Sequence, residues 1–315
     1  MILLAGPTAS GKSALAMALA RRVGGVVINA DSMQVYRELR VVTARPTPAD
    51  ETAVPHRLYG VMPASEACSA ARWRGLAMAE IETAAGRGEV PIVVGGGGLY
   101  LRALVRGLAP VPDVPVAARD EARARHARLG GEAFHAALAA RDPQMAARLH
   151  AGDTQRLIRA WEVIAATGRS LADWQAMAPE APLDASVYTA LVAPERVALY
   201  AACDARFERM LADGALEEVA ALDALGLDAR LPAMKALGVP ALRRHLRGEI
   251  PLAQARATGQ QATRNYAKRQ LTWFRHQITA ELTLSGGSGD APSLLEGVER
   301  FLLTAQGRAT SVRRL

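Results

Sequence analysis

The chain has 315 residues, of which 50% are hydrophobic and 22% charged, so it is long enough for a full core and two lobes. No apolar run approaches the ~20 residues that span a bilayer, and its two cysteines, Cys68 and Cys203, exclude a disulfide framework. The formal net charge of +7 favours a polyanionic partner. We therefore expect a globular, cytoplasmic protein that has no membrane partner.

Strand and helix signals alternate along the first part of the chain. Met1–Ala5 is apolar and runs directly into a glycine-rich loop, which indicates a strand and not a signal peptide. The same patterns predict further strands at Val26–Ala30, Leu58–Val61, Pro91–Gly95 and Val187–Val192, and helices at Lys12–Val23 and Leu99–Gly107. This alternation predicts an α/β fold with a parallel sheet flanked by helices, in which ligands bind at the carboxyl ends of the strands.

Proline-containing breaks divide the chain. Pro110–Pro115 ends the first run of strands, Val116–Met177 is helical throughout, and Pro179–Asp184 leads back to the core. Ser285–Gly289 has the composition of a flexible linker, and the chain ends in the basic pair Arg313–Arg314. We predict an α/β core from residues 1–112 and 187–282, an all-helical insertion at 113–186, and a linker with a C-terminal tail at 283–315.

The segment Gly6–Ser13, with the sequence GPTASGKS, matches the pattern of a phosphate-binding loop, or P-loop, between a predicted strand and a predicted helix. Backbone N–H groups and the helix N-terminus favour bound phosphate, Lys12 neutralises its charge, and the Ser13 hydroxyl suits Mg²⁺. The residues predicted to bind a diphosphate are Gly6, Pro7, Thr8, Ala9, Ser10, Gly11, Lys12 and Ser13. The alternative is a glycine-rich turn without a ligand.

Asp31 follows the second predicted strand and begins the polar run DSMQVY at 31–36. A carboxylate beside a bound diphosphate can accept a proton from a weak nucleophile. Asp31 can instead be a metal ligand in a hydrolase, or merely an aspartate at a strand end.

A basic helix is predicted near the C-terminus, over residues 261–276. Arg264, Lys268 and Arg275 share one face, which suits nucleic-acid phosphates, while Tyr266 and Trp273 share the opposite face and are expected in the core. A surface helix with solvated charges remains the alternative. In the insertion, Gln155 and Arg159 share a helix face, so the insertion is expected to hold a large anionic substrate.

From Leu3 to about Gln277 the chain resembles the tRNA dimethylallyltransferase family, also called tRNA isopentenyltransferases. The resemblance rests on motifs in the family's order: GPTASGKS at 6–13, DSMQVY at 31–36, TARPT at 43–47, VPH at 54–56, GGGGLYLRAL at 95–104, QRLIRAWEV at 155–163, RFERML at 206–211 and TRNYAKRQLTWFR at 263–275. It implies transfer of a dimethylallyl group from dimethylallyl diphosphate to the exocyclic amine of the adenosine 3′-adjacent to the anticodon, with release of diphosphate and with Mg²⁺ as cofactor.

The resemblance also implies roles for single residues. Asp31 would be the general base, Thr8 and Arg206 would join it in catalysis by orienting the diphosphate together with Lys12, and Ser13 would bind the metal. The residues implied to bind tRNA are Asp31, Ser32, Met33, Gln34, Gln155, Arg156, Leu157, Ile158, Arg159, Lys268, Arg269, Gln270, Leu271, Thr272, Trp273, Phe274 and Arg275. The insertion would hold the anticodon stem-loop, and we expect the enzyme to be a monomer.

The chain departs from the family's pattern at three places. Gly97 stands where the family usually has Thr, Val42 where it has Gly, and Leu237–Val239 where it has Ile-Gly-Tyr, with Pro240 following. None of these changes touches the phosphate loop or Asp31.

Three other functions remain open from the sequence. A small-molecule kinase or nucleoside triphosphatase would use the phosphate loop without tRNA. An adenylate isopentenyltransferase would use the same donor with a free nucleotide as acceptor. A protein that only binds RNA would keep the loop for structure alone. The insertion and the segment at 263–275 disfavour the first two, and the intact Lys12, Ser13 and Asp31 disfavour the third.

Overall fold

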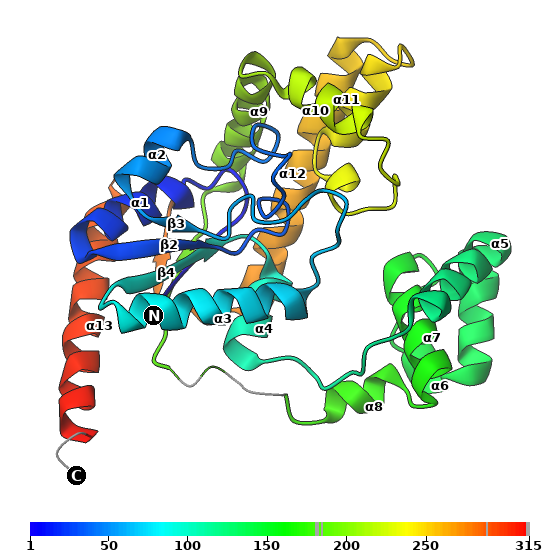
Figure 1. Ribbon diagram of the computed structural model, residues 1–315, viewed down its shortest axis with the longest axis horizontal. Helices are drawn as coiled ribbons and strands as arrows, with labels where there is room; N and C mark the ends of the chain where they lie inside the picture. The colour runs from blue at the N-terminus through cyan, green and yellow to red at the C-terminus, as the bar shows by residue number, and fades with distance from the viewer. Residues whose placement is uncertain (180–182, 184, 288, 313–315) are drawn as a thin grey trace. The chain divides into compact units, whose positions relative to one another are not determined.

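The computed structural model describes residues 1–179, 183, 185–287 and 289–312, with the backbone alone for 305–312. Parts of the two predicted linkers, and the basic pair Arg313–Arg314, therefore lie outside the described residues. The chain forms two compact units, one made of Met1–Leu104 with Ala185–Leu315 and the other of Val105–Asp184 (Figure 1). The smaller unit, Val105–Asp184, includes most of the insertion that was predicted at 113–186.

The larger unit contains a six-stranded sheet in the order β3-β2-β4-β1-β5-β6. Its strands are β1 (Ile2–Ala5), β2 (Gly25–Asn29), β3 (His56–Arg57), β4 (Val90–Gly95), β5 (Tyr188–Val192) and β6 (Leu282–Leu284). Every pairing between neighbouring strands is parallel. The predicted fold class, a parallel sheet flanked by helices, is confirmed. The carboxyl ends of all six strands therefore share one edge of the sheet.

The helices of this unit fall on both sides of the sheet and beyond its edge. They are α1 (Lys12–Val23), α2 (Pro48–Ala53), α3 (Ala70–Gly86), α4 (Gly98–Arg106), α9 (Arg196–Ala212), α10 (Ala215–Ala224), α11 (Val239–Leu246), α12 (Leu252–Gln277) and α13 (Asp290–Val312), with a 3₁₀ turn at Ala233–Lys235.

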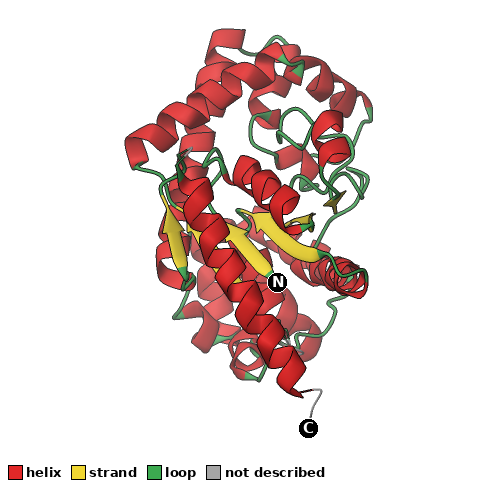
Figure 2. Cartoon of the chain, turned by 90° about the vertical axis from the view of Figure 1, so that its left-hand side faces the viewer, coloured by secondary structure: helices red, strands yellow, loops and turns green. Residues whose placement is uncertain are grey.

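Side-chain alternation along the strands separates two apolar layers. Ile2 and Leu4 of β1 pack in one core with residues of α1 and α13, including Leu19 and Val298. On the other side, α3 contacts β2 and β4, and the buried Trp73 ring donates to the backbone oxygen of Asn29 at 2.9 Å. Figure 2 shows α13 crossing in front of the strands.

The third predicted strand was placed a few residues too late. β3 is His56–Arg57, paired with β2, whereas Leu58–Val61 was predicted. Leu58 and Gly60 have φ of 64° and 61°, so the backbone leaves the extended conformation directly after Arg57. The apolar side chains that suggested a strand belong instead to a turn.

The C-terminal segment is not the linker and tail that we predicted at 283–315. Leu282–Leu284 pairs with β5 as the sixth strand, and α13 packs against α1. Leu294 and Val298 are almost completely buried, and Phe301 and Leu302 pack against the same core. Their helical spacing was present in the sequence, but the glycine and serine residues before it suggested an unstructured end.

The smaller unit is helical in its described residues, as the pattern over 116–177 predicted. Its helices are α5 (Val116–Arg141), α6 (Pro143–Ala146), α7 (Thr154–Thr167) and α8 (Leu171–Ala176). Gly130, with φ of 75°, kinks α5. Phe134, Leu138, Leu157 and Trp161 are buried in a separate core of this unit. Across the described part of both units, no helix is both long and apolar enough to cross a bilayer.

Candidate active site

The phosphate loop, Gly6–Ser13, connects the carboxyl end of β1 to the first turn of α1. Ala9 and Gly11 take φ of 62° and 83°, which turns the backbone sharply before the helix begins. Gly11 caps α1 without a side-chain hydrogen bond, so the first N–H groups of the helix are left for an external acceptor. This geometry suits a bound anion.

Gln270 of α12 fixes the phosphate loop to its neighbour in the sheet. Its Oε1 accepts the N–H of Thr8 at 2.8 Å, and its Nε2 donates to the backbone oxygen of Gly96 at 2.8 Å. A methyl group on residue 96 would lie 2.1 Å from that Nε2, so the bridge requires glycine there. We expected Gln270 to contact tRNA, but both polar ends of this buried side chain are occupied within the protein.

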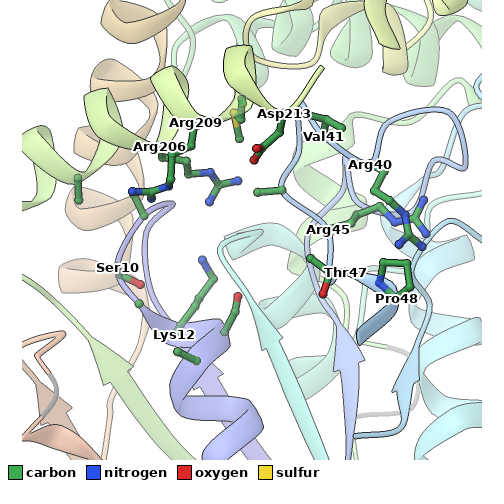
Figure 3. A pocket seen from close by; sticks show the side chains of 17 residues that line it. Ser10, Lys12, Arg40, Val41, Arg45, Thr47, Pro48, Arg206, Arg209 and Asp213 are labelled. Carbon is green, nitrogen blue, oxygen red and sulfur yellow. The ribbon is translucent and has the colours of Figure 1, made fainter. Parts of the chain in front are cut away.

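A cavity of about 670 Å³, called here the phosphate cavity, opens beside the loop. Lys12 and Arg206 extend into it from α1 and α9, and Arg40 and Arg45 lie together on its other side (Figure 3). Five of the six charged lining residues are thus cations, with Asp213 as the one carboxylate, and they line a space bordered by helix N–H groups. The cavity is suited to a polyanion such as a diphosphate.

Burial changes the titration of Lys12 and Arg206. The pKa of Lys12 is lowered to about 8, chiefly because its ammonium is removed from water and further because Arg206 is nearby. Burial also lowers the pKa of Arg206, while Asp31 acts in the opposite direction. Lys12 donates to the backbone oxygen of Pro7 at 3.0 Å, which directs its ammonium along the loop. A bound anion would replace the hydration that these groups have lost.

A second cavity of about 260 Å³ contains Asp31 and is called here the Asp31 cavity. Several chain segments form it, and its lining residues are Thr8, Asp31, Ser32, Met33, Val42, Thr43, Arg206, Lys235, Ala236, Leu237, Tyr266 and Arg269. Of the residues predicted for base contact, Asp31, Ser32 and Met33 therefore share one cavity. Gln34 does not line it; its amide donates to the backbone oxygens of Thr43 and Ala44.

Asp31 is held by the strand end that precedes it. The buried Asn29 side chain accepts the N–H of Asp31 at 2.8 Å and donates to its backbone oxygen at 3.0 Å. Asp31 Oδ1 accepts the N–H of Met33 at 2.8 Å. Oδ2 accepts no hydrogen bond from any described residue, so one carboxylate oxygen is left for a ligand.

Arg206 joins the two cavities. It lines both of them, and its Nη2 donates to the backbone oxygen of Thr43 at 2.7 Å. Thr8, which belongs to the phosphate loop, lines the Asp31 cavity. The three residues predicted to be catalytic, Asp31, Thr8 and Arg206, are thus brought together from three distant segments.

The predicted tRNA-binding segment of α12 divides into two faces. Lys268, Arg269, Thr272 and Arg275 are exposed, as expected of residues that contact RNA, whereas Leu271 and Phe274 are buried in addition to Gln270. Burial removes the side chains of Leu271 and Phe274 from the surface, so the prediction that they contact tRNA is corrected.

The other side chains of this helix also differ from expectation. Arg264 forms an ion pair with Asp204 of α9, so its guanidinium links two helices and does not continue the basic stripe. Tyr266 and Trp273 were expected in the core, but both are half-buried. Tyr266 lines the Asp31 cavity, where burial raises the pKa of its phenol. Helical periodicity alone could not separate a core face from a cavity wall.

In the insertion, the predicted tRNA-binding residues lie at the start of α7. Gln155 and Arg156 are exposed and Ile158 is half-buried. Arg159 forms an ion pair with Glu162 at 2.6 Å. Leu157 is fully buried in the core of the unit, so the expected contact of its side chain with tRNA is corrected.

Sequence reasoning missed several residues of the cavities. Arg40, Arg45 and Arg209 line the phosphate cavity, and Lys235 lines the Asp31 cavity with Tyr266. Arg45, Arg209 and Tyr266 each lie within a motif, and Lys235 is one of only three lysines in an arginine-rich chain, so each carried a weak signal. Nothing in the sequence marked Arg40.

Gly97, where the family pattern has threonine, lies between two strand ends. Its N–H donates to the backbone oxygen of Ala30 at 3.2 Å, and a Cβ on residue 97 would lie 2.7 Å from that oxygen. A larger residue would require the backbone after β2, which carries Asp31, to move. Gly97 therefore permits the close approach of β4 to this segment.

The oxygen donors around the phosphate loop suit a Mg²⁺ ion that is held mainly by the phosphates of a bound substrate. Ser13 is exposed at the first turn of α1 and lines the phosphate cavity. Among the described residues, no group of three or more His, Cys, Asp or Glu side chains forms a metal cage. Magnesium at phosphates commonly keeps several waters and takes few protein ligands, so this donor set fits such an ion.

A parallel sheet with a phosphate loop after β1, and a cationic cavity beside that loop, defines a phosphate-loop α/β protein. The protein-family model described as IPP transferase matches residues 34–277. The chain belongs to this family. The matched region begins after the phosphate loop and Asp31, so these features support the assignment independently.

The chain is similar over most of its length to proteins named tRNA dimethylallyltransferase. The protein from Rhodospirillum centenum is 64% identical over 281 residues, covering 89% of this chain and 90% of that protein. The protein from Nitrobacter hamburgensis is 58% identical and covers 88% of both chains. The crystal structure of the tRNA isopentenylpyrophosphate transferase from Bacillus halodurans is 30% identical, with a TM-score of 0.70, and covers 100% of this chain and 99% of that one.

Proposed function

We propose that the chain transfers a dimethylallyl group from dimethylallyl diphosphate to the exocyclic amine of the adenosine that follows the anticodon in tRNA, with release of diphosphate. Its family and its relatives' names make it an enzyme that modifies tRNA with a dimethylallyl group. The donor, the position of the adenosine and the residue roles below are our proposal.

One observation carries these assignments: Arg206 lines both the phosphate cavity and the Asp31 cavity. A donor held by its diphosphate in the first cavity would direct its allylic carbon toward the second. An adenine amine in the second cavity would then face that carbon beside Asp31. The two reactants would meet next to Arg206 and Thr8.

The phosphate side of the reaction needs charge stabilisation, because the bond between the allylic carbon and the diphosphate oxygen breaks and negative charge grows on the diphosphate. The N–H groups of the loop and of α1 would bind its oxygens, and Lys12 and Arg206 would neutralise it. Ser13 would hold Mg²⁺, which supplies further positive charge to the leaving group when bound. Gln270 keeps the loop in place for this task.

The acceptor side needs a base and a positioned adenine. The lone pair of the amine forms the new bond to carbon, and the amine then loses a proton. Asp31, whose Oδ2 has no partner among the described residues, would accept it. Tyr266 lines the same cavity, and an aromatic ring there suits stacking with a base turned out of the RNA.

The RNA outside the cavity would meet exposed cations. Lys268, Arg269 and Arg275 on α12 suit phosphates near the modified base. Gln155 and Arg156 of the insertion suit the anticodon stem-loop, and we expect the enzyme to act as a monomer in the cytoplasm.

The decisive experiment incubates the protein with labelled dimethylallyl diphosphate, Mg²⁺ and unmodified tRNA. We expect label on the adenosine next to the anticodon, and loss of labelling when the metal is chelated. A tRNA carrying guanosine at that position is the matched control and should stay unlabelled. Label on free AMP but not on tRNA would contradict the proposal and indicate a nucleotide acceptor. Phosphate transfer from ATP to a small molecule, without labelling of tRNA, would indicate a kinase.

A further inference from the structure

Glu218 of α10 holds three successive backbone N–H groups of a distant loop. Its Oε2 accepts the N–H groups of Arg40 and Val41, both at 2.7 Å, and its Oε1 accepts the N–H of Val42 at 2.9 Å. Three consecutive N–H groups that converge on one anion form a concave binding site of the kind that often receives phosphate. Here the protein's own carboxylate fills it.

The loop that Glu218 holds forms a wall of both cavities. Arg40 and Val41 line the phosphate cavity, and Val42 and Thr43 line the Asp31 cavity. The next residue, Ala44, has φ of 47°, so the loop turns sharply directly after the held segment. A displacement of residues 40–43 would therefore alter both cavities together.

The same loop orients Arg206. The backbone oxygen of Thr43 accepts Arg206 Nη2 at 2.7 Å and the Gln34 amide at 2.9 Å. Thr43 is thus the point at which the loop held by Glu218 meets the guanidinium shared by the two cavities. The chain of contacts runs from the Glu218 carboxylate through residues 40–43 to Arg206.

A charged carboxylate is suited to this task in a way that a neutral side chain is not. Hydrogen bonds from N–H groups to a carboxylate are stronger than those between neutral groups. An amide in its place has one accepting oxygen, and its NH₂ group would face an N–H donor. In addition, an unfilled site of three N–H groups at the cavity wall would offer the diphosphate a second, unproductive position.

We propose that Glu218 is a positioning residue for dimethylallyl transfer: it holds residues 40–43 so that Thr43 directs Arg206 toward the diphosphate. The inference rests on the proposed function, because dimethylallyl transfer is the reaction it concerns. The effect of Glu218 on diphosphate binding can be measured without tRNA. Glu218 itself touches no reactant.

The test is a double-mutant cycle with Glu218→Gln and Arg206→Ala, read out by the Kd for inorganic diphosphate and by kcat and KM for labelling of tRNA. We expect Glu218→Gln to weaken diphosphate binding and to lower kcat/KM about tenfold, which is within the coupling found between residues of one hydrogen-bond network. In the Arg206→Ala background, the same substitution should change both by less than about twofold.

Three controls accompany this test. Glu217→Gln changes the exposed neighbouring carboxylate and should leave all three quantities unchanged. Glu218→Asp retains the carboxylate on a shorter side chain and should recover part of the loss. The affinity for tRNA should fall less than the affinity for diphosphate in every Glu218 variant, because the exposed cations Lys268 and Arg275, proposed to bind RNA phosphates, line neither cavity.

Equal fold losses from Glu218→Gln with and without Arg206 would overturn the inference, since they would show that Glu218 does not act through Arg206. A parallel loss of tRNA affinity and thermal stability would do the same by indicating general unfolding. If wild-type protein labels no tRNA but the cycle on diphosphate binding still shows coupling, the proposed function fails, while the positioning of Arg206 by Glu218 for diphosphate binding stands.

Discussion

The phosphate loop and the Asp31 cavity lie at the same edge of the sheet, but they are assembled in opposite ways. The loop is one continuous segment, Gly6–Ser13, whose ligand groups are mostly its own backbone N–H groups and those of α1. The Asp31 cavity draws residues from the phosphate loop, the loop after β2, α9, the segment around the 3₁₀ turn at Ala233–Lys235, and α12. A local motif can therefore specify the first, whereas only tertiary packing can create the second.

Because of this difference, substitutions around the phosphate loop and substitution of Asp31 should have different effects. Side chains around the loop act mainly through charge, so their removal should weaken diphosphate binding by degrees. Asp31 supplies a chemical function that no other residue of its cavity duplicates, since the other ionisable side chains there are Arg206, Lys235, Tyr266 and Arg269. The predictions below test this contrast, beginning with the largest effect.

Asp31→Asn should separate chemistry from binding. The amide keeps the size of the side chain and can still accept the N–H of Met33, but it cannot take a proton. We expect kcat to fall by roughly 10²- to 10⁴-fold, the usual contribution of a general base, while the Kd values for diphosphate and tRNA change by less than about threefold. Single-turnover labelling and filter binding measure the two quantities. Similar losses in rate and in tRNA affinity would make Asp31 a positioning residue.

The lowered pKa of Lys12 predicts a pH dependence on the phosphate side. Because the pKa is about 8, the ammonium is present below that pH and is progressively lost above it. Affinity for dimethylallyl diphosphate should therefore decline by up to about tenfold between pH 7 and pH 9.

The matched control for this pH dependence is Lys12→Arg, whose guanidinium stays charged throughout the range. Titration of the ligand itself affects both proteins equally, so only the difference between their slopes reports on Lys12. Identical slopes for the two proteins would exclude Lys12 as the titrating group. Calorimetry at five or so pH values is sufficient to compare them.

The smallest expected effect concerns the exposed face of α12. Lys268→Ala should weaken tRNA binding a few-fold and reduce the slope of log Kd against log salt by about one, because one phosphate contact is lost. Arg264→Ala is the control: Arg264 lies on the same helix but pairs with Asp204, so its loss should leave the salt slope unchanged. A larger change in the salt slope for Arg264→Ala than for Lys268→Ala would contradict this assignment.

Much of the candidate site could be predicted because its signals are local. The GPTASGKS loop, the strand before it and the helix after it depend on contacts between near neighbours in the chain, and Asp31 is marked by its place after a buried strand. Resemblance to a family added Arg206, which carries no local signal of its own. These residues do converge on the two cavities.

The errors share a physical cause. Gln270, Leu271 and Phe274 lie in a segment that is strongly basic, but the choice between surface and interior is made at each position by what packs against it. Gln270 is buried because Thr8 and Gly96 approach it from the segments that follow β1 and β4. The C-terminal segment was misjudged for the same reason, since β6 becomes a strand only by pairing with β5.

The sequence by itself determined the phosphate loop, the parallel α/β core and the position of Asp31 at a strand end, because each follows from periodicity or from a short motif. The tertiary structure alone decided that Arg206 lies between two cavities, that Glu218 holds the loop in front of it, and that Gln270 supports the phosphate loop from within. These contacts join residues more than a hundred positions apart, so they depend on how the chain packs, and no local pattern encodes them.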